Sequence, residues 1–265
     1  MRVTQNVDSK ASFWENSRVS HNDYLSEKLI PVRERLIFAL DVPTVDEAKA
    51  LVETLGESVV FYKLGLQIFM AGGYYELIDW LNSLQKKVFV DLKFFDVPET
   101  VKSAVAQLKG RGVTFVTVHG NEGILRAAVE CGSGLKILAV TVLTSLDRGD
   151  LNDLGFDCNV ADLVLSRARR ALDGGCDGVI SSGLEAERLR TELGDRFLIV
   201  SPGIRPVDND VVDDQKRTVD VEEAFRKGAD YIVVGRPIRK AQDPKAKAEE
   251  IQGRIASLFE PKVQT

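Results

Sequence analysis

The sequence predicts an α/β fold, a (β/α)8 TIM barrel preceded by an N-terminal extension. After residue 35, short runs rich in Val, Ile, Leu and Phe alternate with charged, amphipathic stretches. The apolar runs are almost continuous, which is typical of parallel strands covered by helices. Eight strand–helix units fit into roughly 230 residues, which is the number and length of such a barrel.

We expect strands at 36–41, 59–65, 87–93, 113–119, 136–143, 177–181, 197–201 and 230–235. Amphipathic helices are expected at 46–55, 74–85, 99–110, 121–131, 160–175, 185–193, 221–228 and 244–259. A doubly wound open sheet is the alternative, but no G-x-G-x-x-G follows the first strand, which weakens it. Residues 1–34 are expected to form the extension, packed on the barrel or partly disordered, and 35–265 the catalytic barrel domain.

Composition excludes several classes of protein. The chain has 265 residues, of which 44% are hydrophobic and 28% charged, and its net charge of −5 comes from interspersed acids and bases. The lack of a basic block argues against nucleic-acid binding. No apolar run approaches the ~18 residues that a bilayer span needs. The first 20 residues show no apolar stretch of signal-peptide type, so we expect neither nucleic acid nor membrane as a partner.

Cysteine and histidine usage limits the chemistry further. Cys131, Cys158 and Cys176 are scattered and lack the paired spacing of a zinc site, so they are interpreted as reduced thiols of a cytoplasmic protein. His21 and His119 are the only histidines. A histidine-rich metal centre is therefore not expected, and no metal ligand is assigned. Any catalysis is therefore expected from Asp, Lys, Arg, Thr and Ser side chains.

The third strand carries the most informative charges. It continues into VFVDLKFFDVPET at 88–100, where alternation places Phe89, Asp91 and Lys93 on one face and only apolar side chains on the other. Burying a carboxylate and an ammonium costs several kcal/mol per ion before their attraction repays any of it. Charges retained at the mouth of a hydrophobic strand therefore indicate chemistry. Asp96 completes an Asp-x-Lys-x-x-Asp pattern.

Other strand ends add to this charged set. In such barrels the active site lies at the carboxyl ends of the strands, where Asp41 ends the first strand and Lys63 the second. Together with Asp91 and Lys93 they alternate acid and base. Opposite neighbours hold each lysine protonated and each carboxylate ionised, which predicts a preorganised electrostatic site.

Structural interpretations of each residue stay open. Asp96 precedes Val97-Pro98-Glu99 and has the sequence context of a helix N-cap. Lys63 could extend from a strand end into solvent, and Asp41 could be a turn residue before Pro43. His119 is expected to be a satisfied structural histidine. These interpretations would all have to hold at once to remove the site.

The seventh and eighth units predict a phosphate site. SPGIRP at 201–206 and VVGRPI at 233–238 are Gly/Arg turns directly after apolar strands. The loops after strands seven and eight of a barrel frequently bind phosphate through backbone N–H groups. Arg236 can grip a phosphate with its fork of donors. The long segment 206–218 between the two turns has the length of a lid or binding loop.

These motifs together resemble the orotidine 5′-phosphate decarboxylase family in its shorter bacterial form. The resemblance rests on ALD (39–41), YKLG (62–65), VDLKFFDVPETV (90–101), VTVH (116–119), LAVTVLTS (138–145), SPGIRP (201–206), DDQKR (213–217) and VVGRPI (233–238). It runs in order from about residue 36 to the C-terminus, and the extension departs from it. The resemblance implies decarboxylation of orotidine monophosphate to UMP, in pyrimidine nucleotide synthesis, with no metal or organic cofactor.

The resemblance also implies roles for single residues. Lys93 would donate a proton to the ring carbon that loses carboxylate, and Asp91 would lie against the substrate carboxylate. Asp41 and Lys63 would hold the ribose hydroxyls. Asp96 and Thr100 match positions that the family donates into the neighbouring subunit's site, which implies a homodimer. The expected catalytic residues are Lys93, Asp91, Lys63 and Asp96, and the further ligand contacts are Thr144, Pro202, Arg205, Gln215, Gly235 and Arg236.

Two rival functions remain open at this point. D-x-K-x-x-D is shared with magnesium-dependent sugar-phosphate decarboxylases and aldolases of related barrels, which need oxygen ligands at the strand ends. VLTS and DQKR argue against that reading, and a chelator separates the two. A phosphate-ligand-binding barrel without catalysis would predict a gap in the charge chain, and the sequence shows none.

Overall fold

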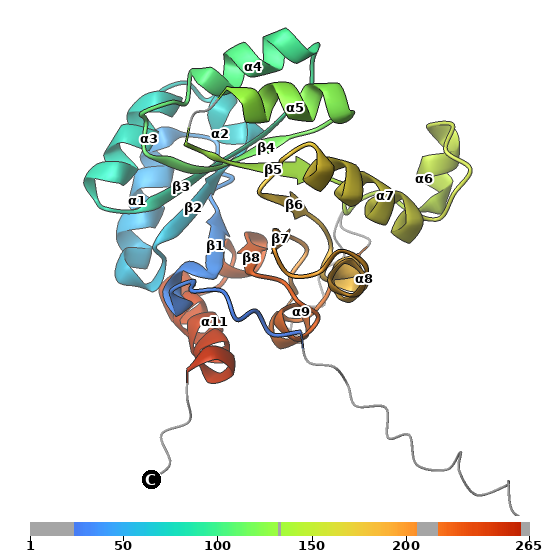
Figure 1. Cartoon of the computed structure of the whole chain (residues 1–265). Coiled ribbons are helices and arrows are strands. Elements are labelled where there is room, and N and C mark those ends of the chain that lie inside the picture. The colour runs from blue at the N-terminus through green and yellow to red at the C-terminus, as the bar shows by residue number, and fades with distance from the viewer. Residues whose placement is uncertain (1–23, 132–133, 206–216, 261–265) are drawn as a thin grey trace, which may run out of the picture.

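The chain forms a closed barrel of eight parallel strands, each followed by one or more helices (Figure 1). The computed structural model describes residues 24–131, 134–205 and 217–260. Strand order around the barrel follows sequence order, β1 to β8, and β8 pairs with β1. The predicted fold class is therefore confirmed, and the open-sheet alternative is wrong because no sheet edge is left unpaired.

All eight expected strands exist; seven are shorter than predicted, and the third is one residue longer. They are Leu36–Ala39, Phe61–Leu64, Lys87–Phe94, Val113–Val118, Lys136–Val140, Gly178–Ile180, Leu198–Ser201 and Tyr231–Val234, labelled β1 to β8. Most of their residues are buried on both faces, as expected for parallel strands inside a ring of helices. Of the charged residues expected at these strand ends, Asp41 falls in the loop after β1, whereas Lys63, Asp91 and Lys93 lie within β2 and β3.

The eight expected helices are present as α1 (Val45–Leu55), α3 (Tyr74–Ser83), α4 (Pro98–Ala106), α5 (Glu122–Glu130), α7 (Val160–Asp173), α8 (Gly183–Leu193), α9 (Val221–Arg226) and α11 (Pro244–Phe259). Three short helices are additional: α2 (Leu66–Met70), α6 (Arg148–Asp153) and α10 (Arg236–Arg239). Two 3-10 turns, η1 (Val32–Glu34) and η2 (Gly56–Ser58), precede β1 and β2. Elements of four to six residues are too short to show a helical period.

Aromatic side chains fill the barrel interior. Phe61, Phe89, Phe115 and Tyr231 come from four different strands and contact one another with ring centroids 5.1 to 6.0 Å apart. All four are buried, and they belong to an inner cluster separate from the larger core between strands and helices. The barrel is therefore packed rather than open.

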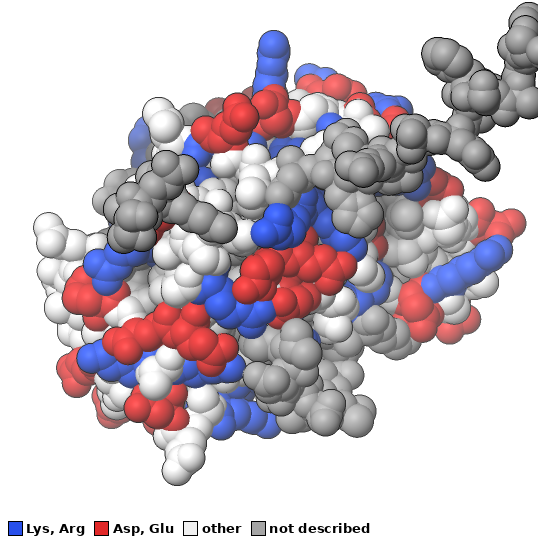
Figure 2. Space-filling view, turned by 90° about the horizontal axis from the view of Figure 1, so that it is seen from below, with Lys and Arg blue, Asp and Glu red and all other residues white. Residues whose placement is uncertain are grey.

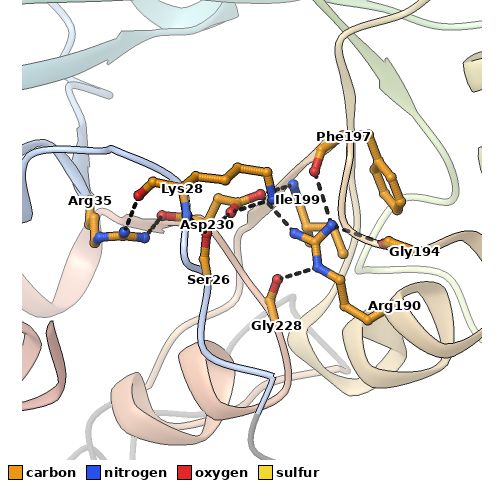
Figure 3. A network of polar contacts seen from close by, with 9 residues as sticks. All are labelled: Ser26, Lys28, Arg35, Arg190, Gly194, Phe197, Ile199, Gly228 and Asp230. Atoms are coloured by element: carbon orange, nitrogen blue, oxygen red, sulfur yellow. Dashed lines mark hydrogen bonds and ion pairs between the residues drawn. The ribbon is translucent and has the colours of Figure 1, made fainter.

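The N-terminal strap, residues 24–31, crosses the amino end of the barrel, opposite the strand ends that carry the charged set. Asp230, directly before β8, is wholly buried there. Its carboxylate accepts hydrogen bonds from Ser26 Oγ (2.5 Å), Lys28 Nζ (3.0 Å), Arg190 Nη2 (2.7 Å) and the Ile199 backbone N–H (2.9 Å) (Figure 3). A buried carboxylate is tolerated only with such compensation, so the strap shares in stabilising the barrel.

Two further contacts attach the strap. Arg35 donates from Nη1 to the Asp230 carbonyl and from Nη2 to the Lys28 carbonyl, both at 3.2 Å (Figure 3). The Tyr24 backbone N–H donates to the Arg226 carbonyl at 2.8 Å. Residues 24–31 are thus packed on the barrel, and residues 1–23 lie outside the described part.

The surface agrees with the charge pattern of the sequence. In the view from below, Lys and Arg side chains are interspersed with Asp and Glu, with no extended area of one sign (Figure 2). Among the described residues, no helix is both long and apolar enough to cross a membrane. In the same residues, no cluster of three His, Cys, Asp or Glu side chains has the arrangement of a metal site.

Candidate active site

A cavity of about 490 Å³ opens at the carboxyl ends of the strands. It collects residues from widely separated parts of the chain, because parallel strands all end at the same mouth. Of the predicted site residues, those lining it are Asp41, Lys63, Asp91, Lys93, Thr144, Pro202, Arg205, Gly235 and Arg236. The floor is apolar and includes Ala39, Phe89 and Val233.

Four of these side chains form a continuous chain of opposite charges. Lys63 Nζ lies 3.2 Å from Asp41 Oδ1 and 3.4 Å from Asp91 Oδ2. The other carboxylate oxygen, Asp91 Oδ1, lies 3.0 Å from Lys93 Nζ. The inner pair is the more buried, since the side chains of Lys63 and Asp91 are each 11% exposed, against 42% for Asp41. The predicted alternation of acid and base therefore exists as direct contacts.

The electrostatic balance favours the ionised form of the inner pair. Burial alone raises the pKa of Asp91, but the ammonium groups of Lys63 and Lys93 outweigh it and hold that pKa below its ordinary range. Burial likewise lowers the pKa of Lys63, but Asp91 and Asp41 outweigh it and raise that pKa above its ordinary value. Each charge is thus stabilised by its neighbours rather than by water.

The backbone is irregular where β3 delivers Asp91 and Lys93. β3 and β4 pair at Val90↔Val116 and again at Phe94↔Val118, so three residues of β3 lie opposite Thr117 alone. Within this bulge Lys93 has φ +50°, a left-handed conformation that costs a non-glycine residue about 1–3 kcal/mol. The expectation of regular alternation through Lys93 is therefore wrong, and the bulge is what turns the lysine onto the carboxylate.

Gly65 leaves room for the charge chain. A Cβ at this position would lie 3.0 Å from Asp41 Oδ1 and 3.1 Å from Lys63 Nζ. Gly65 also lines the cavity. A side chain here would displace the acid–base contacts, so the glycine is required by close approach rather than by its φ angle.

The loops after β7 and β8 form the other side of the cavity. Gly203, with φ +78°, and Pro202 follow β7, and Gly235 and Arg236 follow β8. A Cβ on Gly235 would approach Ala39 Cβ to 3.1 Å. The cavity is thus basic on one side, where a phosphate is expected, and has the Asp/Lys chain on the other.

Two of the predicted residues, Asp96 and Thr100, do not line the cavity of their own chain. They are exposed on the β3–α4 connection and the first turn of α4. Helix α4 takes Val97 as its N-cap, while Asp96 Oδ1 accepts a hydrogen bond from the Val97 backbone N–H, so Asp96 is not the cap residue. Gln215 lies outside the described residues.

Three residues that line the cavity or lie behind it were not predicted from the sequence. Gln67, in α2, and Arg239, in α10, line the cavity. Arg239 follows Arg236 by three residues in a helical turn, a spacing that brings both to one face, so the spacing was an available signal. Thr117 is wholly buried behind Asp91, and only the strand register reveals it.

Comparison with known proteins gives one consistent answer. The model of the orotidine 5′-phosphate decarboxylase / HUMPS family matches residues 34–251. Orotidine 5′-phosphate decarboxylase of Methylococcus capsulatus is 62% identical over 237 residues, which is 89% of this chain and 98% of that protein. The enzyme of the same name from Xanthomonas euvesicatoria is 52% identical over 87% of this chain and 95% of its own length.

A solved structure agrees with the sequence relatives. The crystal structure of orotidine 5′-phosphate decarboxylase from Lactobacillus acidophilus superposes with a TM-score of 0.73 at 36% identity, over 84% of this chain and 99% of that one. The residues matched by the family model, 34–251, include all eight strands and all the residues that line the cavity. The chain belongs to the orotidine 5′-phosphate decarboxylase / HUMPS family.

Proposed function

We propose that the chain decarboxylates orotidine 5′-phosphate to UMP in pyrimidine biosynthesis, without a metal or organic cofactor. The observation that carries this proposal is the unbroken chain Asp41–Lys63–Asp91–Lys93 on one side of a cavity whose other side is basic. The relatives that share this barrel over nearly their whole length bear the name of that activity. The proposal takes the cavity as the substrate site.

The reaction requires the site to stabilise negative charge on a ring carbon. The bond between the ring carbon and its carboxylate breaks, carbon dioxide leaves, and the electron pair remains on a carbon that has no electron sink nearby. A fixed ammonium group beside that carbon stabilises the developing negative charge and then supplies the proton. Lys93 takes this role, since its Nζ is held at the cavity by Asp91. Solvent then reprotonates the lysine.

Asp91 and Lys63 complete the reacting end. Asp91 would lie against the substrate carboxylate, and its negative charge favours departure of that group as neutral carbon dioxide. Lys63 keeps Asp91 ionised and, with Asp41, holds the ribose hydroxyls. Because these charges are arranged before the substrate binds, little reorganisation is needed during the reaction.

The remaining contacts orient the nucleotide. Gly235 and Arg236 bind the phosphate through backbone N–H and guanidinium groups, and Thr144 contacts the pyrimidine. Pro202 and Arg205, after β7, enclose the ligand, and Gln215 is assigned to the same group from the family resemblance. Binding energy from the distant phosphate is available to hold the base against Lys93.

A homodimer with shared sites is part of the proposal. Asp96 and Thr100 would act in the partner's cavity, since both are exposed and outside their own. Large exposed apolar side chains follow the neighbouring strands β2 and β3: Leu66, Phe69, Met70, Phe95 and Val97. Such clustered exposure is typical of an interaction surface.

Location in the cytoplasm is proposed from three unpaired cysteines, Cys131, Cys158 and Cys176.

The test of the proposal is decarboxylation of orotidine 5′-phosphate by the purified chain, followed by ultraviolet absorbance with and without EDTA. Turnover that EDTA leaves unchanged supports the cofactor-free enzyme. Turnover lost with EDTA and restored by magnesium would assign the chain to the metal-dependent rivals.

The proposed dimer is tested by mixing Asp96→Ala protein with Lys93→Ala protein. If sites are shared, random pairing gives one intact site in half of the dimers, so about a quarter of the wild-type activity should return.

A further inference from the structure

The irregular contact between β3 and β4 places one threonine behind the charge chain. Between the paired positions Val90↔Val116 and Phe94↔Val118, Thr117 is the single β4 residue that faces the three-residue bulge. Thr117 lies two residues after Phe115 and therefore on the inner face of the barrel, one step nearer the mouth. It is 0% exposed and does not line the cavity.

The Thr117 hydroxyl joins the two central charged residues. It donates a hydrogen bond to Asp91 Oδ1 at 2.9 Å and accepts one from the Lys93 backbone N–H at 3.0 Å. The same Asp91 oxygen contacts Lys93 Nζ at 3.0 Å. One hydroxyl thus closes a small ring that includes the carboxylate, the lysine backbone and the lysine ammonium. A buried hydroxyl that makes both its bonds is rigid and fully compensated.

The lysine backbone needs this support. Lys93 has φ +50°, which side-chain-bearing residues rarely adopt, and it lies in the bulge, where the regular register with β4 is interrupted. Its backbone N–H donates to the Thr117 side-chain oxygen at 3.0 Å. A conformation of this kind persists only where the surroundings over-determine it, and the pairing resumes at once with the His119 N–H donating to the Phe94 carbonyl at 2.9 Å.

We propose that Thr117 is a positioning residue: its hydroxyl fixes the Asp91 carboxylate and the backbone of Lys93 so that the ammonium group is held at the reacting carbon. The inference rests on the proposed decarboxylation. Thr117 touches no substrate and acts through its two neighbours. Packing alone would be served equally well by valine, which has the same shape, so only the hydrogen bonds distinguish the two residues.

Loss of the Thr117 hydroxyl should also change the pH dependence of turnover. Burial raises the pKa of Asp91, but Lys63, Lys93 and, as a smaller contribution, the hydrogen bond from Thr117 together hold it below its ordinary range. Removing this hydrogen bond should move the acid limb of the pH–rate profile to higher pH. The charged or titratable groups around Asp91 on the packed elements are Lys63 (β2), Lys93 (β3), Tyr74 (α3), Asp41 beyond Lys63, and His119 at the end of β4.

The experiment compares Thr117→Val with Thr117→Ser. Thr117→Val should lower kcat roughly ten- to a hundredfold, the loss expected for one hydrogen bond to a charged group. Its KM and its affinity for UMP should stay within about twofold, because no ligand contact changes. Thr117→Ser keeps the hydroxyl and should restore most of kcat and the wild-type acid limb. Thr114→Val, the same change on β4 at a half-buried position, is the matched control.

Several results would overturn the inference. One is a kcat of Thr117→Val equal to that of wild type. Another is equal impairment of the valine and serine variants, which would indicate packing. A crystal structure of Thr117→Val in which the φ of Lys93 and its contact with Asp91 are unchanged would contradict it without any assay. Wild-type protein that binds UMP but does not decarboxylate the substrate would instead remove the proposed function.

Discussion

Lys93 Nζ lies 3.0 Å from Asp91 Oδ1 although the two residues are only two apart on one strand. On a regular strand such side chains run side by side, roughly 6–7 Å apart at the backbone. The contact arises because β3 bulges between Val90 and Phe94 and Lys93 takes a positive φ. Backbone strain at this point is thus coupled directly to the placement of the proposed proton donor.

The strain at Lys93 predicts that a glycine variant is more stable than an alanine variant, which is the reverse of the order in a regular strand. At φ +50°, Lys93→Gly should be more stable than Lys93→Ala by about 0.5–1 kcal/mol, because relief of the left-handed penalty exceeds the extra chain entropy of glycine. In a regular strand alanine is the more stable. Urea unfolding of both variants measures the difference, and a more stable alanine variant would show that Lys93 is not strained.

The basic side of the cavity predicts a binding defect in Arg236→Ala. Loss of a charge-assisted phosphate contact should raise KM about ten- to a hundredfold and change kcat much less. Orotidine, which lacks the phosphate, should be processed equally by the variant and wild type. Arg126→Ala, on the exposed face of α5 and paired with Glu122 at 2.8 Å, is the control. An unchanged KM for the phosphorylated substrate in Arg236→Ala would contradict the phosphate assignment.

The charge chain predicts a broad pH plateau. A lowered pKa of Asp91 means that its stabilising, ionised form is present above about 3.9 and is lost only as pH falls through the lower folded value. A raised pKa of Lys63 means that its contribution holds below about 10.4 and is lost only above that value. Turnover should therefore be flat from about pH 6 to 9 as far as these two groups are concerned.

Profiles of kcat, with stability followed by circular dichroism, test this plateau. His119 is the other group to consider, because burial, Arg167 and Lys93 lower its pKa from an ordinary value near 6.5. A limb that disappears in His119→Asn would belong to the histidine. If the pH–rate profile of His119→Asn still falls near pH 7, Asp91 takes up a proton there, which would contradict its lowered pKa.

Asp230→Asn should destabilise the fold without altering the chemistry. The variant leaves Arg190, whose side chain is 5% exposed, beside an uncharged partner. Breaking a buried ion pair costs roughly 3–5 kcal/mol, and the strap loses the anion that holds Lys28. Asp162→Asn, which breaks the exposed contact with Arg188, should cost much less, because exposed ion pairs contribute little to stability. Urea unfolding compares them, and equal losses would mean that Asp230 is not essential to the strap.

The sequence was informative wherever the pattern is local. Eight apolar runs predicted eight strands, and strand ends predicted Asp41, Lys63, Asp91 and Lys93 at one mouth, because parallel strands of a barrel all end together. The Gly/Arg turns after β7 and β8 predicted Gly235 and Arg236 in the cavity for the same reason. These inferences need only the order of elements along the chain.

What the sequence missed depends on register and on short elements. The bulge of β3 and the role of Thr117 follow from pairing with β4, which no spacing in either strand reveals. Gln67 and Arg239 reach the cavity from α2 and α10, helices of five and four residues that carry no period. The strap was not predicted to bind Asp230, since that contact joins positions about 200 residues apart.

In the proposed reaction, Lys93 supplies the proton to the carbon that loses carboxylate. We would first measure the turnover of orotidine 5′-phosphate by wild-type protein and by Lys93→Ala, with the exposed Lys245→Ala as control and folding checked by circular dichroism. Wild type and control should be active, and the Lys93→Ala rate should be lower by at least about 10⁴-fold, the upper range for loss of a proton-transfer group. A folded Lys93→Ala variant that turns over near the wild-type rate would contradict it.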